Sequence, residues 1–192
     1  MTIAITLPKL LLSTLATASI FAGWTAQASA QERLLDEVRI GSLVAVDKTE
    51  TNDERGAFIS GMVFFDPWGH NEAQGWEKLI KPRIHVGGNI ATADEANQVY
   101  AGFSWTANLT DRLFLEAGFG GTLHDGDLVA DGTDGPKLGC SLLFHEYAAA
   151  GFNLNEQWRV VAHIEHSSHA DLCQNRPNNG LSRAGVMIGY KF

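Results

Sequence analysis

The chain has 192 residues, which is enough for one domain with a sizeable core, and its formal net charge is −8. This acidic balance argues against nucleic acid as a partner, because nucleic-acid binding depends on basic side chains that neutralise phosphates. It does not exclude a membrane, since β-barrels insert by an apolar belt rather than by charge.

The first 30 residues have the features of a secretion signal. Lys9 supplies a positive n-region, Leu10 to Phe21 form a short apolar run, and Ala28-Ser29-Ala30 is a small-x-small cleavage site. The alternative, a retained membrane anchor, is disfavoured because the run is too short. We therefore expect residues 1–30 to be a signal peptide and residues 31–192 to form the exported domain.

The rest of the chain consists of short segments in which apolar and polar residues alternate, as side chains do along a β-strand. In one segment Leu113, Leu115, Ala117 and Phe119 share a face, and Glu116 lies on the other. We expect about eight strands, each near the ten-residue length that spans a membrane as part of a barrel. In chain order they cover residues 36–48, 56–66, 80–91, 97–107, 111–122, 138–152, 157–168 and 181–192.

This pattern predicts an all-β fold, an eight-stranded antiparallel transmembrane β-barrel. A soluble β-sandwich also alternates and is the competing interpretation. Two features favour the barrel: the less apolar face carries small residues and single charges, and the chain ends on Phe192, an aromatic residue that closes an amphipathic strand. We expect the inward charged residues to form a hydrogen-bonded core rather than a channel, because eight strands leave no aqueous pore. They are Glu116, Glu165, His163 and Arg159.

The stretch 67–79 does not fit a tight turn between two strands. It contains Trp68 and Trp76, residues that are enriched at the level of lipid headgroups. We expect a short helix or an interfacial segment here.

The two cysteines, Cys140 and Cys173, are expected to lie on one side of the barrel. With an even number of strands and both termini in the periplasm, the loop at 169–180 is extracellular, and the sixth strand begins at the same rim. An exported protein meets an oxidising compartment, so we expect these cysteines to form a disulfide, with two free thiols as the alternative.

His166 and Ser168 are two residues apart, so their side chains share one face of the seventh strand. That face is the apolar one, because it also carries Ala162 and Ile164. A histidine beside a serine can act as a general base and a nucleophile. If the apolar face contacts lipid, only a group carried by a lipid reaches the pair, which favours an esterase acting on the outer leaflet.

A metal site is the competing explanation of this segment. His163, His166 and His169 recur every third residue, and Asp171 follows them. Positions three apart on a strand alternate faces, so these side chains do not converge on one ion without a bend. We expect no metal or other cofactor.

The segment His166-Ser167-Ser168-His169-Ala170, followed by Asn178-Asn179-Gly180 and a terminal strand, resembles the PagL-type lipid A 3-O-deacylases of the acyloxyacyl hydrolase group. Phe144-His145-Glu146 resembles a Phe-x-Glu-like segment of the same family. The resemblance is specific over residues 138–192. It implies an eight-stranded outer-membrane barrel that removes the ester-linked 3-O hydroxyacyl chain of lipid A.

The resemblance also implies roles for individual residues. Ser168 corresponds to the nucleophile, His166 to the base, and Asn178 to a position that we assign to the oxyanion hole. The family's acid falls two residues after the glycine that ends the last loop, where this chain has Ser182. A serine can exchange a hydrogen bond with the imidazole but cannot stabilise an imidazolium as a carboxylate does.

Two acids near the pair are further candidates. Asp171 lies in the last loop and could fold back, whereas Glu165 points to the other face and is a poor candidate. The family also has asparagine directly after the serine, and this chain has His169 there.

The sequence thus predicts a serine esterase of the bacterial outer membrane whose partner is lipid A within lipopolysaccharide. It leaves open whether the chain forms a homodimer. One alternative is a non-catalytic structural or adhesive barrel, which the serine at position 182 favours. Another is a soluble periplasmic β-sandwich that binds a ligand.

Overall fold

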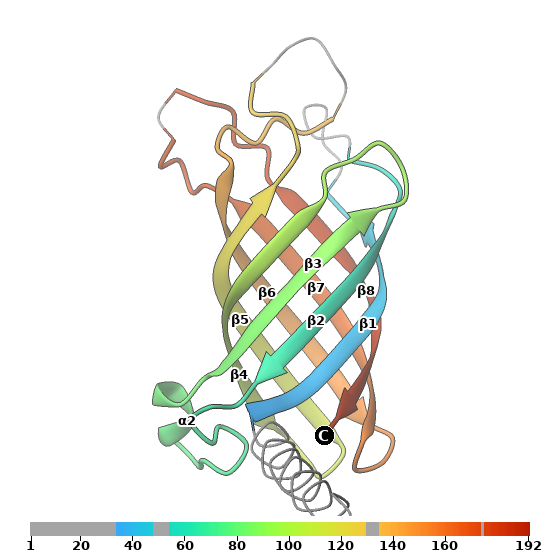
Figure 1. Ribbon diagram of the computed structural model, residues 1–192, viewed down its shortest axis with the longest axis vertical. Coiled ribbons are helices and arrows are strands. Elements are labelled where there is room, and N and C mark those ends of the chain that lie inside the picture. Colours follow the sequence, from blue (N-terminus) through green and yellow to red (C-terminus); the bar gives the residue numbers. More distant parts are fainter. Residues whose placement is uncertain (1–33, 48–53, 130–134, 174) are drawn as a thin grey trace, which may run out of the picture. The chain divides into compact units, whose positions relative to one another are not determined.

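The computed structural model describes residues 34–47, 54–129, 135–173 and 175–192. The chain divides into Met1–Leu34 and Leu35–Phe192, and the second unit is a closed barrel (Figure 1). The expected signal peptide lies outside the described residues. The strands of the barrel are β1 (Leu35–Ala45), β2 (Ala57–Phe65), β3 (Arg83–Ala91), β4 (Gln98–Asn108), β5 (Leu113–His124), β6 (Leu142–Asn153), β7 (Trp158–Ser168) and β8 (Leu181–Lys191).

Each strand pairs antiparallel with the next, and β8 pairs with β1 to close the sheet. Closure confirms the predicted eight-stranded barrel and rules out the β-sandwich, which has open edges. The observed strands follow the predicted ones closely, with three exceptions. β1 ends three residues before the predicted end at 48, and β3 and β6 begin three and four residues later than the predicted starts at 80 and 138. The residues ahead of these two strands belong to connecting segments.

The segment between β2 and β3 contains a short helix, α2 (Glu77–Ile80). A short helix was one of the two structures expected for the stretch 67–79. The Trp68 ring packs on the Phe103 ring of β4, with centroids 6.2 Å apart, and Trp76 is exposed. α2 and the C-terminus lie at one end of the barrel, and the segments that follow β5 and β7 lie at the other (Figure 1). Within the described residues, no helix is long and apolar enough to cross a membrane.

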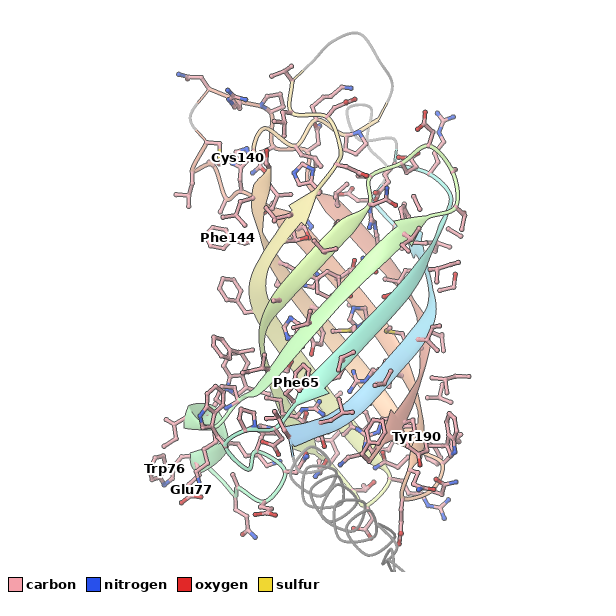
Figure 2. The ribbon with its side chains drawn as sticks, in the orientation of Figure 1. Phe65, Trp76, Glu77, Cys140, Phe144 and Tyr190 are labelled. Atoms are coloured by element: carbon pink, nitrogen blue, oxygen red, sulfur yellow. A yellow bond between two sulfur atoms is a disulfide. The ribbon has the colours of Figure 1, made fainter. Side chains whose placement is uncertain are left out.

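The polarity of the two faces of the sheet is the reverse of that in a soluble protein: the outer face is apolar and the inner face is polar. Large apolar side chains such as Ile40, Val99 and Ile164 point outward and are 50–65% exposed. Polar and charged side chains such as Glu37, Arg39 and Arg183 point inward and are fully buried. This distribution matches a barrel whose outer surface contacts lipid (Figure 2).

A cluster of charged groups fills the barrel interior near the end where β1 begins. Arg39 donates through Nη1 to Glu116 Oε1 at 2.7 Å and through Nε to Glu37 Oε1 at 2.6 Å. Arg83 donates to both of these glutamates as well, and the guanidinium groups of Arg39 and Arg83 lie over the Phe64 ring at 4.3 and 4.5 Å. The interior is therefore a bonded core, as predicted, rather than a channel.

We expect Glu116→Ala to destabilise the barrel by about 3–5 kcal/mol, because it removes the shared anion of two fully buried guanidinium groups. Urea unfolding in lipid vesicles measures this loss. Glu77→Ala is the matched control, because Glu77 forms an exposed pair with Lys81 at 3.6 Å. Loss of this pair should change stability by less than about 1 kcal/mol. Equal effects of the two substitutions would contradict a structural role for the cluster.

Candidate active site

His166 and Ser168 project from the outer face of β7, as the alternation predicts. Both are half-buried, whereas Ser167 between them is buried and faces the interior. The pair therefore ends an outward stripe that begins with apolar residues, among them Ala162 and Ile164. A polar pair at this position faces the surroundings of the barrel and not its interior.

Ser182 on β8 lies directly opposite His166 in the strand register. The two side chains are joined by a hydrogen bond of 2.8 Å between His166 Nδ1 and Ser182 Oγ. The position at which the resemblance places the acid is thus in contact with the predicted base. A neutral imidazole with its proton on Nδ1 donates to this hydroxyl, which leaves Nε2 as the proton acceptor.

The Cε1–Nε2 edge of the imidazole lies against Gly180. A Cβ atom at this position would come within 2.8 Å of His166 Cε1 and 3.3 Å of Nε2, and Gly180 has a φ of 71°, which disfavours other residues. Glycine at the end of the loop therefore makes room for the ring. Within the described residues, no hydrogen bond joins Ser168 to the ring, a contact that is often loose in ligand-free enzymes.

A third outward side chain next to His166 is that of Glu146, which the sequence analysis did not assign to the site. It lies on β6 directly opposite His166, points outward and is half-buried. Side chains at directly opposite positions have Cβ atoms roughly 4.5–5.5 Å apart. The sequence analysis noted the resemblance of the Phe144-His145-Glu146 segment to the family, which includes this glutamate. Only the pairing register shows that His166 lies between Glu146 and Ser182.

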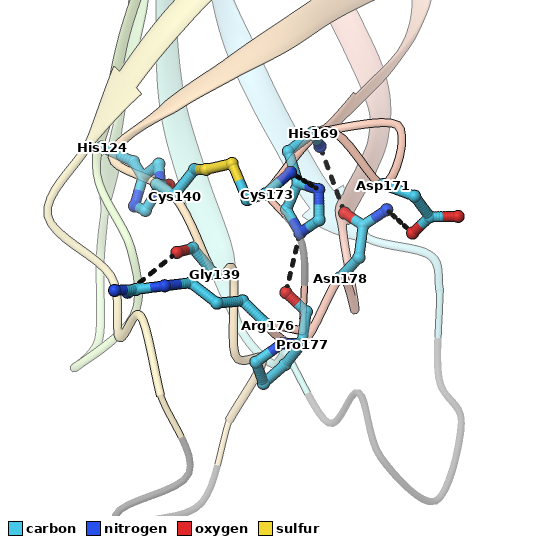
Figure 3. Close-up of a disulfide and its surroundings, with 9 residues drawn as sticks. All are labelled: His124, Gly139, Cys140, His169, Asp171, Cys173, Arg176, Pro177 and Asn178. Atoms are coloured by element: carbon cyan, nitrogen blue, oxygen red, sulfur yellow. Dashed lines mark hydrogen bonds between the residues drawn. A yellow bond between two sulfur atoms is a disulfide. The ribbon is translucent and has the colours of Figure 1, made fainter.

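The loop after β7 holds Asn178, the predicted oxyanion residue, in a fixed orientation. Asn178 Oδ1 accepts the backbone N–H of His169 at 3.1 Å, and Nδ2 donates to Asp171 Oδ1 at 3.3 Å (Figure 3). Asp171 therefore interacts with Asn178 in this structure rather than folding back onto the imidazole of His166. The second hydrogen of Asn178 Nδ2 is not used by this contact.

His169, at the position where the resemblance implies asparagine, organises the same loop. Its ring is buried, and its Nε2 lies 2.9 Å from the carbonyl oxygen of Pro177. Its backbone N–H is the group that bonds to Asn178. His169 is thus a loop-stabilising side chain directly after Ser168, the predicted nucleophile.

A disulfide between Cys140 and Cys173 ties this loop to the segment that precedes β6, with the Cα atoms 6.3 Å apart (Figure 3). This is the pairing that the sequence predicted. Arg176 adds a second link by donating through Nη1 to the carbonyl oxygen of Gly139 at 3.3 Å. The loop after β7 and the segment before β6 are therefore linked to each other at the end of the barrel where His166 and Ser168 lie.

The histidines that suggested a metal site lie on different faces. His163 is buried inside the barrel, 3.2 Å from the buried carboxylate of Glu165, whereas His166 points outward. Glu165 accordingly faces away from His166, as expected from the alternation. In the part of the chain that the structure describes, no three histidine, cysteine or acidic side chains are grouped as metal ligands would be.

The closed barrel with its apolar exterior defines the class of the protein as a transmembrane-type β-barrel, and the histidine–serine pair lies on its outer face. The family described as "Lipid A 3-O-deacylase (PagL)" matches residues 68–191, which is more than half of the chain. The chain therefore belongs to this family, whose activity is that of a carboxylic ester hydrolase.

The crystal structure of the outer membrane enzyme PagL is similar to this barrel. The TM-score is 0.59 with 21% identity over 80% of this chain and 97% of that chain, which shows a shared fold. A structure from the de novo design of transmembrane β-barrels has a TM-score of 0.47 and 11% identity, and covers 82% of this chain and 96% of that one. No curated protein matches the sequence.

We expect Ser182→Glu to raise kcat for ester hydrolysis about tenfold or more, because a carboxylate next to Nδ1 stabilises the imidazolium that forms when the base is protonated. Ser182→Gln is the matched control, since it has nearly the same size without the charge. Steady-state hydrolysis of lipid A in detergent micelles measures both variants. Equal rates for the two would show that position 182 is not where the acid acts.

Proposed function

We propose that this chain is an outer-membrane serine esterase that removes the ester-linked 3-O hydroxyacyl chain of lipid A. The observation that carries the proposal is the placement of His166, whose Nδ1 is held by Ser182 on the lipid-facing surface of the barrel. Only a substrate embedded in the same membrane reaches a base on that surface. Residues 1–30 would then act as the export signal, and lipid A of the outer leaflet is the partner.

In the proposed reaction Ser168 is the nucleophile and His166 the general base. Nε2 of the imidazole accepts the proton from the Ser168 hydroxyl as Oγ attacks the ester carbonyl, which forms a tetrahedral oxyanion. Collapse of this species breaks the bond to the 3-oxygen of the sugar, which takes the proton from Nε2 and leaves. Water then enters, gives a proton to Nε2 and attacks the carbonyl carbon of the acyl-serine. Collapse of this second tetrahedral species breaks the bond to Ser168 Oγ, which takes the proton back from Nε2, and the hydroxy fatty acid is released.

Asn178 is the proposed donor to the oxyanion. Its Oδ1 is held by the backbone of His169, and its Nδ2 retains one hydrogen beyond the contact with Asp171. A donor fixed before the reaction stabilises developing charge without a cost of reorganisation.

Two residues would share the work that a single acid performs elsewhere in the family. Ser182 fixes the tautomer of the imidazole by accepting from Nδ1–H, and Glu146 supplies the negative charge from the neighbouring strand. A carboxylate about one strand spacing away attracts the imidazolium, and this attraction strengthens where lipid excludes water.

A non-catalytic barrel is the second candidate, and one observation favours it. The side chain that contacts His166 Nδ1 is a hydroxyl and not a carboxylate. In a serine hydrolase, exchange of this acid for a neutral side chain can lower kcat by about 10⁴.

We expect the folded protein to remove one hydroxyacyl chain from purified lipid A and Ser168→Ala to abolish this reaction, because the alanine lacks the attacking oxygen. Mass spectrometry of the lipid measures the loss of mass. Ser167→Ala is the matched control, because Ser167 faces the barrel interior and should leave the reaction intact. An unchanged lipid mass with folded protein would favour the non-catalytic barrel.

We further expect Glu146→Gln to lower kcat about tenfold while KM stays nearly constant, because the charge of Glu146 acts on the imidazolium and not on the bound ester. The double variant Glu146→Gln/Ser182→Glu should recover the lost rate, since it returns a carboxylate to the imidazole. Initial rates over a range of lipid A concentrations separate kcat from KM. A change in KM alone would instead indicate that Glu146 contributes to binding.

A further inference from the structure

A polar pocket of about 430 Å³ lies at the end of the barrel away from the proposed active site. Its lining comes from the ends of β3, β4, β6, β7 and β8 and from segments that connect strands. It includes three basic side chains, those of Arg83, Arg159 and Lys191. This is the end at which the C-terminus lies in Figure 1, and the orientation expected from the sequence places it in the periplasm.

The basic side chains of the pocket lie on the inner face of the sheet. Arg159 shares this face of β7 with the buried residues Val161 and His163. Lys191 shares it on β8 with Met187, which is also buried. A soluble molecule can therefore enter the pocket from the open end of the barrel, whereas a lipid headgroup would have to leave the bilayer to reach it.

Arg159 is a buried cation whose hydrogen-bonding capacity is only partly used. The residue is 7% exposed, and its guanidinium lies over the Phe114 ring at 4.6 Å. It donates through Nη1 to Glu37 Oε2 at 3.2 Å. Its Nε is buried, and no described residue accepts a hydrogen bond from it. A buried charged donor without an acceptor is costly, so a ligand that supplies acceptor oxygens here stabilises the protein.

The charges around Arg159 do not balance. The ion pairs of this cluster, among the described residues, join four basic side chains to three carboxylates. They are Arg39, Arg83, Arg159 and Lys191 on one side and Asp36, Glu37 and Glu116 on the other. One positive charge is therefore left without a counterpart in the cluster. The acidic side chain on the lining, Asp111, is exposed in the turn between β4 and β5, where water and salt screen its charge.

Lys191 carries the ammonium group that is paired least closely. Its Nζ is 3.9 Å from Asp36 Oδ1, which is too far for a hydrogen bond. That oxygen already accepts from Asn71 Nδ2 at 2.7 Å, and the other oxygen of Asp36 accepts from Arg83. The ammonium of Lys191 therefore retains hydrogens for a ligand.

The strand register brings Arg159 and Lys191 together. Arg159 is opposite Gly189 in the pairing of β7 with β8, and Lys191 is the next inward residue of β8. Diagonal neighbours of this kind are roughly 7–8 Å apart, a distance that long side chains span. Gly189 leaves the space that Arg159 occupies, since a Cβ atom there would come within 2.8 Å of Arg159 Cγ. One anion in the pocket can thus contact both cations.

We propose that this pocket binds a phosphate group from the periplasm, held between the guanidinium of Arg159 and the ammonium of Lys191. The forked donors of arginine match the oxygens of an oxyanion, and a phosphate has enough oxygens to bind two cations at once. Thr110 adds a donor on the lining, because its Oγ1 accepts two backbone N–H groups and its own hydrogen stays available. The volume of about 430 Å³ also admits the organic part of a small phosphate monoester.

Calorimetric titration with inorganic phosphate tests the proposal on the folded protein in uncharged maltoside micelles, with chloride holding the ionic strength constant. We expect saturable binding and a Kd at least about tenfold weaker for Lys191→Gln, whose distant pair with Asp36 contributes little to folding. Arg112→Gln is the matched control, because it removes the same charge from an exposed residue at the same end that does not line the pocket. Its Kd should change less than about twofold. Heats that do not saturate, or equal weakening by the two substitutions, would overturn the proposal.

Two further titrations define the ligand and its source. Acetate should bind at least about tenfold more weakly than phosphate, because its two oxygens reach fewer donors. Equal affinities would overturn the assignment of a phosphate group. In lipid nanodiscs, which leave both ends of the barrel open, the ratio of the Kd of Lys191→Gln to that of the unchanged protein should be the same with and without phosphatidylglycerol. A ratio that falls towards one with this lipid would show that its headgroup is the occupant and would overturn the periplasmic source.

The phosphate site is independent of the proposed esterase. Arg159 is the second residue of β7 and Ser168 is the last, so the two sites lie at opposite ends of this strand. Ser168→Ala should therefore bind phosphate with an unchanged Kd, whether or not the chain hydrolyses lipid A. Loss of phosphate binding in folded Ser168→Ala protein would contradict the location of the site.

Discussion

The barrel depends on one constraint: lipid offers no hydrogen-bond partner to a peptide group, so every N–H and C=O in the membrane must be paired within the sheet. Pairing of β8 with β1 meets this requirement by removing the two edges. Closure then gives every strand one face toward the lipid and one toward a narrow interior. Eight strands enclose just enough space for side chains to fill. The charged cluster around Arg39, Arg83 and Glu116 occupies this space.

The proposed site follows from the same geometry on the outer face. A cleft is not needed when the surrounding membrane holds the substrate, so three adjacent strands can present the reacting groups on an open surface. Glu146, His166 and Ser182 form one row across β6, β7 and β8, and Ser168 lies one outward position further along β7. Because strands fix side-chain direction more tightly than loops do, the row needs only the loop residue Asn178 to complete it.

The segment before β6 and the loop after β7 are held in place by contacts between their own residues. The Cys140–Cys173 disulfide, the buried ring of His169 and the bonds of Asn178 link two segments that follow different strands. A change in the family pattern at His169 is therefore compatible with an ordered site, since the replacement side chain makes its own contacts with the loop.

The sequence by itself determined the strands, their two faces and the outward pair of His166 and Ser168, because alternation with a period of two is a local property of each strand. It also placed Glu165 correctly on the inner face. Only the tertiary structure decided that Glu146 and Ser182 lie on either side of His166. These relations depend on register, which is set by hydrogen bonds between strands and by closure of the whole barrel, and alternation within one strand does not contain that information.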